Sequence, residues 1–333
     1  MPIMLNDLIS KLPSETEDKV RRAKERFNER IREALRRETR LSLYRGSGDG
    51  RDRRDDVIQV PISIDPGLPE VLVPSNKQTI EDKYHLAILL GPHRERLTHM
   101  RDSGKSVAEK LLPLLRNDPK ATALLNGGEA HVKGAADYAD FLLRRLNDFQ
   151  LTGFILQVNE DVLGVYNYRI HRGYDEPKPK IRLFWGVIGL VAQDLGVKVE
   201  DLTGVVLAHE LGHAYTHVGS DADDHCWSSA LFSASDHELK EGLAQYYTLR
   251  VCQRLKEFHP ALLSAYEALL PHQPEAYQVH TEWNEATAER VRLAMLETRR
   301  SRYKGTLKEF QGRLQMANDQ LANAQVAGVE TLF

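Results

Sequence analysis

Three residues at a fixed spacing, His209, Glu210 and His213, have the types and order that activate water on a metal ion. They sit in an apolar stretch, 204–215, that predicts a buried helix, so the two histidines lie one above the other on one face. Their imidazoles can hold one zinc ion together, and Glu210 can reach a metal-bound water. Zinc lowers the pKa of that water and polarises a carbonyl, while the glutamate takes the proton. Because burying these groups is costly unless they are paired or bind a metal, the stretch predicts a hydrolytic zinc site.

A catalytic zinc site needs a third protein ligand. Residues 237–247 predict a second buried helix with two carboxylates in its first turns, Glu238 and Glu241. Together with the His-Glu-x-x-His pattern, the run of Glu241 followed by Gly-Leu-Ala resembles the gluzincin metallopeptidases, in which a downstream helix carries a glutamate ligand. The resemblance covers residues 150–285. It implies that zinc is held by three side chains: His209, His213 and Glu241. It also implies that Glu210 is the catalytic base.

Several neighbouring polar residues are alternatives or supports for this site. Glu238, on an adjacent helical face, remains the alternative to Glu241, which we favour for the Gly-Leu-Ala that follows it. Gln245 stands where some gluzincins place an aspartate, and its amide can accept an imidazole N–H without adding charge. His217 continues the face of the two histidines and is either a group that supports them or an ordinary helix-end histidine. The polar loop between the helices is either a solvated connector or a source of further ligands: Asp221, Asp223, Asp224, His225 and Cys226.

A zinc peptidase also needs a hydrogen-bond donor for the oxyanion that forms during hydrolysis. Tyr246, Tyr277 and His280 are the candidates, and the alternative is that they are buried side chains satisfied by backbone groups. In the family that the chain resembles, an exposed sheet edge beside the zinc pairs with the extended backbone of the substrate. The strand expected at 162–168 is our candidate for that edge, with an ordinary sheet strand as the alternative.

These residues require an α+β fold with a zincin-like core, made of a small sheet, the HExxH helix and the helix of the glutamate ligand. Alternating apolar residues predict strands at 153–158, 162–168 and 180–185, and an edge strand near Pro61. A helix is expected at 186–194. We expect helical extensions at both ends, in this division: 1–45, an N-terminal amphipathic helix; 46–78, a loop and strand linker; 79–150, a helical subdomain; 151–285, the catalytic core; 286–333, a long C-terminal helix.

The helices outside the core are predicted from their apolar stripes. The first, 14–38, begins at a capping box formed by Ser14 and Glu17. Within the subdomain we expect helices at 80–90, at 106–112 up to Pro113, and at 135–149. The last of these has a predicted buried stripe: Tyr138, Phe141, Leu142, Leu146 and Phe149. The C-terminal pattern has heptad spacing with bends expected at Gly305 and Gly312, and it would pair with the first helix or with a second copy.

Composition narrows the function classes. A formal net charge of -3 gives no global case for nucleic acid. Residues 19–54 hold 14 Lys or Arg against 6 Asp or Glu, which suits a basic arm, although the interleaved acids favour a solvated helix face. The chain has no apolar run long enough to span a membrane and no signal peptide, and its two cysteines, Cys226 and Cys252, make no disulfide framework. A cytoplasmic protein with reduced thiols is therefore expected.

The resulting hypothesis is a zinc metallopeptidase that hydrolyses peptide bonds, with Glu210 as general base and a peptide or protein as substrate. One alternative is a zinc-binding scaffold or interaction protein with an inactive peptidase-like core. Another is binding of nucleic acid or a partner through the basic N-terminal arm. No membrane partner is expected, and the choice between internal and terminal cleavage stays open.

Overall fold

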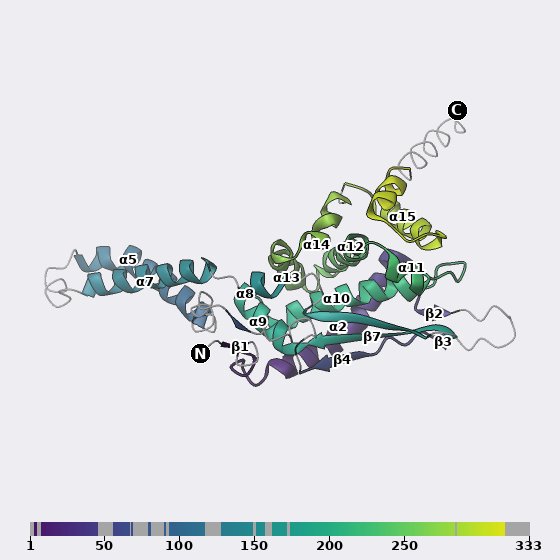
Figure 1. The fold of residues 1–333 in the computed structure, drawn as a ribbon. Coiled ribbons are helices and arrows are strands. Elements are labelled where there is room, and N and C mark those ends of the chain that lie inside the picture. The colour runs from purple at the N-terminus through teal and green to yellow at the C-terminus, as the bar shows by residue number, and fades with distance from the viewer. Residues whose placement is uncertain are drawn as a thin grey trace, which may run out of the picture.

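The computed structural model describes residues 3–4, 8–45, 56–66, 68, 79–80, 90, 93–116, 128–148, 151–156, 162–171, 174–283 and 285–316. Their fold is α+β and mostly helical, with one small three-stranded sheet, as the sequence predicted at this level. Figure 1 shows α10 (Val199–Val218) in the middle of the body, between the sheet on one side and α12 (His237–Leu255) on the other. No described helix is long and apolar enough to cross a bilayer.

The sheet has the strand order β4–β7–β6, from β4 (Ile62–Asp65), β7 (Tyr174–Phe184) and β6 (Gly164–His171). β4 runs parallel to β7 and β6 runs antiparallel to it. Within the described residues β4 and β6 are therefore the two edges, which confirms the strands predicted near 162–168 and 180–185 and the edge strand beside Pro61. Two further antiparallel pairs are two residues long: β1 (Ile3–Met4) with β5 (Thr79–Ile80), and β2 (Tyr44–Arg45) with β3 (Asp56–Val57).

The strand predicted at 153–158 is wrong, because the chain forms α8 (Leu151–Leu156) there. A short apolar run fits a strand or a buried helical turn equally well, and tertiary contacts decide. Here Asp194, near the end of α9 (Trp185–Leu195), accepts hydrogen bonds from the Thr152 backbone N–H at 2.8 Å and from its hydroxyl at 2.7 Å. These two bonds hold the first turn of α8 against α9.

The N-terminal helix, α2 (Thr16–Thr39), is part of the body and packs against both α10 and α12. Its apolar stripe is fully buried: Val20, Phe27, Ile31 and Leu35. Near its end, buried Glu38 accepts hydrogen bonds from Arg250 at 3.0 Å and from Arg254 at 2.7 Å, both on α12. The predicted capping box is wrong, because α2 begins after Glu15 and no side chain caps it.

A helical hairpin of α5 (Arg94–Arg116) and α7 (Gly128–Asp148) projects away from the body in Figure 1. α5 continues past the end predicted at Pro113, because an interior proline removes one hydrogen bond without always ending a helix. The stripe predicted for α7 is wrong at Tyr138 and Phe141, which are 59% and 50% exposed, while Leu143 is buried. Leu142 is half-buried, and the side chains of Leu146 and Phe149 lie outside the described part of the structure. The predicted helix at 80–90 lies outside the described residues except at its two ends, and Ile80 belongs to β5.

The C-terminal part holds several short helices, some of which pack against α12. They are α11 (Ser229–Ala234), α13 (Pro260–Leu269), α14 (Glu275–Gln278), the 3-10 turns η4 (Leu270–His272) and η5 (Val279–Trp283), and α15 (Ala288–Arg300). The single long helix predicted at 286–333 is wrong over its described part, which breaks at 301–306 before a second helix at 307–316. At the break, the Gly305 N–H donates to the Ser235 hydroxyl at 2.7 Å, so a tertiary bond replaces a helical one. α15 does contact α2, the intramolecular pairing that we expected.

Candidate metal centre

Two buried helices, α10 and α12, bring the metal-binding candidates together. α10 is buried from Leu202 to Val218, so the histidine pair faces the interior of the protein, as predicted. A close approach between the helices occurs at Gly212, where an added Cβ would lie 3.2 Å from the Ala244 carbonyl oxygen and 3.3 Å from its Cα. The glycine inside the His-Glu-x-x-His pattern therefore lets α12 come close enough for Glu241 to reach His213.

The three candidate ligand atoms form a nearly equilateral triangle. His209 Nε2 and His213 Nε2 lie 3.1 Å apart, and each lies 3.2 Å from Glu241 Oε2. Tetrahedral zinc with ligands at about 2.0–2.2 Å requires ligand atoms about 3.3 Å apart, so the triangle fits one such ion. These three residues form the one group of potential metal ligands found within the described residues.

The protonation state of Glu241 also suits a metal ligand. Its carboxyl is buried, which by itself would raise its pKa, but the neighbouring imidazoles of His213 and His209 outweigh burial and hold the pKa well below its ordinary value. The side chain is therefore ionised, as a ligand must be. Glu238, the alternative third ligand, is exposed and lies outside this cluster.

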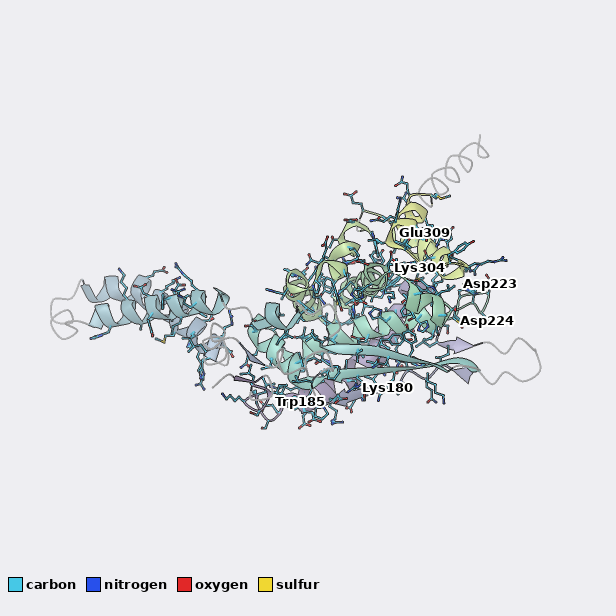
Figure 2. All side chains as sticks on the ribbon, in the orientation of Figure 1. Lys180, Trp185, Asp223, Asp224, Lys304 and Glu309 are labelled. Carbon is cyan, nitrogen blue, oxygen red and sulfur yellow. The ribbon has the colours of Figure 1, made fainter. Side chains whose placement is uncertain are left out.

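The polar loop between α10 and α11 contributes no ligand to this cluster. Asp221 accepts a hydrogen bond from Arg300 at 2.9 Å and others from the backbone N–H groups of Asp223 and His225 at 3.0 Å. Figure 2 shows Asp223 and Asp224 at the periphery, at the opposite end of the molecule from the α5–α7 hairpin. The described contacts favour the connector interpretation of this loop, which Arg300 of α15 holds in place.

The predicted base, Glu210, is buried and lies directly beneath strand β6. Glu210 is 1% exposed, and a Cβ built on Gly164 would lie 2.8 Å from Glu210 Oε1. The first residue of the edge strand must therefore be glycine for the strand and the carboxylate to come this close. Sheet edge and carboxylate meet at one point, which is the arrangement that the resemblance implied.

A small cavity of about 30 Å³ opens beside Glu210 and His209. It has room for about two water-sized groups. Its remaining lining is mainly apolar and comes from α8, from the start of β6 and the residues before it, from α10, from α12 and from the α13–α14 region: Leu156, Val162, Leu163, Gly164, Val205, Val206, Gln245, Leu269, Gln273, Pro274 and Tyr277. Any group bound there contacts the candidate base and one candidate ligand.

Tyr166 of β6 supports His213, a role that the sequence analysis missed. Its ring stacks on the His213 imidazole with the centroids 6.2 Å apart, and its hydroxyl lies 2.9 Å from His217 Nδ1. His217 Nε2 in turn lies 2.9 Å from the Ser229 hydroxyl. Burial lowers the pKa of His217 to about 3, so the ring is neutral and anchors the tyrosine by hydrogen bonding. His217 is thus a supporting group, the first of the two alternatives.

His237 is a second residue that sequence reasoning missed, although its spacing offered a signal. It stands four residues before Glu241, so both lie on one face of α12. Its Nδ1 lies 3.6 Å from Glu241 Oε1, the carboxylate oxygen that does not face the histidine pair, and its ring meets Tyr277 edge-on at 6.3 Å. His237 therefore flanks the cluster from the side of the first turn of α12.

The three oxyanion candidates are placed differently. Tyr277 lines the cavity and stacks on the His209 imidazole with the centroids 5.5 Å apart. Both ring nitrogens of His280 are engaged, since Nδ1 donates to the Tyr277 carbonyl at 2.8 Å and Nε2 accepts from the Tyr266 hydroxyl at 2.6 Å. Tyr246 packs against Tyr247 at 5.3 Å and is not part of the cavity wall. Tyr277 is the candidate that the structure brings to the site.

Comparisons with protein-family models, with curated proteins and with solved structures find no match for this chain.

Proposed function

We propose that this protein is a zinc-dependent peptidase with a zincin-like core of the gluzincin type. The observation that supports it is the triangle of His209, His213 and Glu241, with a buried carboxylate, Glu210, one residue from a ligand. The donor set of two imidazoles and one carboxylate is the set used by catalytic zinc in peptidases. A structural zinc site has four protein ligands, whereas three are found here within the described residues.

The site residues have distinct roles in the proposed hydrolysis. When bound, zinc would supply Lewis acidity toward a carbonyl oxygen and toward water. Glu210 accepts the proton of the attacking water and returns it to the leaving amine, and its burial keeps it from being screened by solvent. Tyr277, which lines the cavity and stacks on His209, is the proposed hydrogen-bond donor to the oxyanion. The edge of β6 that does not face β7 pairs with no other described strand, and it would offer backbone N–H and C=O groups to an extended peptide.

The described contacts favour no second function. Four of the nine basic residues of α2 pair with acids on the helix or just before it, as Arg21 does with Glu17 at 2.9 Å and Arg37 with Glu33 at 2.7 Å. A scaffold protein with structural zinc has no use for a general base buried beside the ligands. The position of Glu210 is the reason to prefer an enzyme.

The metal is tested by measuring the zinc content of the purified protein beside two variants. Glu241→Ala removes a ligand and should lower the zinc content from about one ion per chain to near zero. Glu238→Ala is the matched control, since it removes an exposed carboxylate three residues earlier on the same helix and should leave the zinc content unchanged. Equal zinc in all three proteins would contradict the assignment of Glu241.

The reaction is tested with a peptide library and mass spectrometry. The wild type should cut peptides, and Glu210→Gln should keep its zinc while cleavage falls by about 10²-fold or more, because proton transfer by a positioned group contributes that much. A zinc-loaded wild type that cuts nothing in the library would reject the peptidase. Unchanged cleavage by Glu210→Gln would reject the role given to the base.

A further inference from the structure

Gln245, on the wall of the cavity beside Glu210, has incomplete hydrogen bonding among the described residues. Gln245 lies one turn after Glu241 on α12, so it faces the same side of the helix, and it is 2% exposed. Its Nε2 donates to Gln273 Oε1 at 2.9 Å, while its Oε1 accepts no hydrogen bond from a described residue. Leaving a buried acceptor unpaired is costly, so such an atom calls for a partner. The missing partner is a hydrogen-bond donor.

The rest of the cavity sets the size and polarity of that partner. Its walls beside Gln245 are mostly aliphatic, including Val205, Val206 and Leu269. The volume of about 30 Å³ admits about two water-sized groups. The occupant must therefore be small, largely apolar on its surface, and able to donate one hydrogen bond.

We propose that this cavity binds the side chain of a threonine, or of the smaller serine, in the residue next to the bond that is cut. The methyl group of threonine contacts the aliphatic wall, and its hydroxyl donates to Gln245 Oε1. His209 and Glu210 line the same cavity, so the bound side chain lies beside the reacting centre. This assignment of substrate class rests on the proposed peptidase function.

Competing side chains are rejected for different physical reasons. Valine has the shape of threonine but no donor, so it displaces water from the cavity and leaves Gln245 Oε1 unpaired. A site built to bind a hydroxyl discriminates strongly against an analogue that lacks it, because the polar group of the protein then stays unsatisfied. Phenylalanine and leucine exceed the cavity volume. The expected order of preference is threonine and serine, then valine, then large side chains.

The test is a binding experiment that does not require turnover. Three extended peptides that differ at one position, with threonine, valine or phenylalanine, are titrated calorimetrically into the zinc-loaded Glu210→Gln variant. Threonine should bind at least about 10-fold more tightly than valine, and phenylalanine more weakly than both. Adding Gln245→Met, which keeps the side-chain size and removes the acceptor, should bring the ratio of threonine to valine affinities to about one. Gln253→Met, an exposed position on the same helix, is the matched control and should keep the original ratio.

The outcomes separate this inference from the peptidase itself when the wild type is assayed for cleavage of the same peptides. Equal affinity for threonine and valine, or a preference that survives Gln245→Met, overturns the side-chain assignment even if all peptides are cut. Should Gln245→Met fail to fold, the comparison of threonine and valine affinities in the Glu210→Gln variant, which keeps Gln245, decides this point. Selective binding of threonine without any cleavage rejects the peptidase and leaves the binding site. No binding and no cleavage rejects both.

Discussion

The close contact between Gly164 and Glu210 predicts that Gly164→Ala slows catalysis, because the added methyl group would displace the carboxylate of the proposed base. A Cβ at position 164 would lie 2.8 Å from Glu210 Oε1 and 2.9 Å from Val206 Cγ1, whereas ordinary contacts begin at 3.4 Å. Gly164→Ala therefore forces a displacement of at least about 0.6 Å, the difference between 3.4 Å and 2.8 Å. Gly164 is paired with Leu183 of β7, so the strand cannot retreat without loss of sheet pairing. The carboxylate, at the end of a flexible side chain, moves more easily.

The magnitude follows from the cost of overpacking. Adding a methylene to a close-packed site costs about 1–3 kcal/mol. If this cost appears mainly as a displaced base, cleavage slows by about 5- to 150-fold, since each ~1.4 kcal/mol is a factor of ten in rate. The three atoms nearest to the new methyl group belong to Glu210 and Val206 and to none of the candidate zinc ligands, so zinc content should stay at the wild-type level.

The assay compares kcat/KM for peptide cleavage, zinc content and Tm in the wild type and in two alanine variants. Gly134→Ala on α7 is the matched control: an added Cβ there meets no atom within 4 Å, and alanine is favoured over glycine inside a helix. It should leave kcat/KM unchanged. If Gly164→Ala is as active as the wild type, the carboxylate of Glu210 is not held at the position that catalysis requires, and the geometric argument for the base fails.

Two further predictions concern pH and are checked by denaturant unfolding of the metal-free protein. The folded-state pKa of Glu241 is lowered, so its ionised carboxylate stabilises the fold above the ordinary value of 4.5, and this stability is lost as the pH falls through the folded pKa; Glu241→Gln should lack that loss. For His217 the pKa is about 3 in the folded state and 6.5 in the unfolded state, so only the unfolded chain binds the proton between these values. The free energy of unfolding therefore decreases by about 1.4 kcal/mol for each unit by which the pH falls from 6.5 to 3. His217→Phe should flatten this slope, and an unchanged slope would refute the neutral, buried imidazole.

The parts of the fold that were predictable from sequence are those whose pattern is local and long. The helix around 204–215 and the one at 237–247 have long stretches of apolar residues, and the strands at 162–168 and 180–185 have β-branched and aromatic residues in alternation. The helix α8 was not predictable, because an element of six residues carries no clear period and the bonds to Asp194 come from another element. The break at 301–306 likewise depends on a bond between residues about seventy positions apart.

The same distinction applies to the candidate site. The histidine pair, Glu210 and Glu241 follow from spacing along two helices, and the structure brings the ligand atoms of the three metal-ligand candidates within about 3.2 Å of one another. The stacking of Tyr166 on His213 and the bond from Gln245 to Gln273 join elements far apart in the chain. No periodicity in the sequence predicts these two contacts, so they can be identified only from the structure.

The attachment of α2 to α12 has a practical consequence for dissecting this protein. Glu38 of α2 holds two arginines of the helix that also carries Glu241, and the apolar side of α2 fills the space behind α10. Deleting α2 would expose the apolar surfaces of α10 and α12 that pack against it and would remove the carboxylate partner of Arg250 and Arg254. Any role of the basic surface is therefore better probed by charge reversal at solvent-facing positions, such as Arg21→Glu, than by deletion. The N-terminal helix, which the sequence suggested is an extension, is therefore a structural part of the core that supports the site.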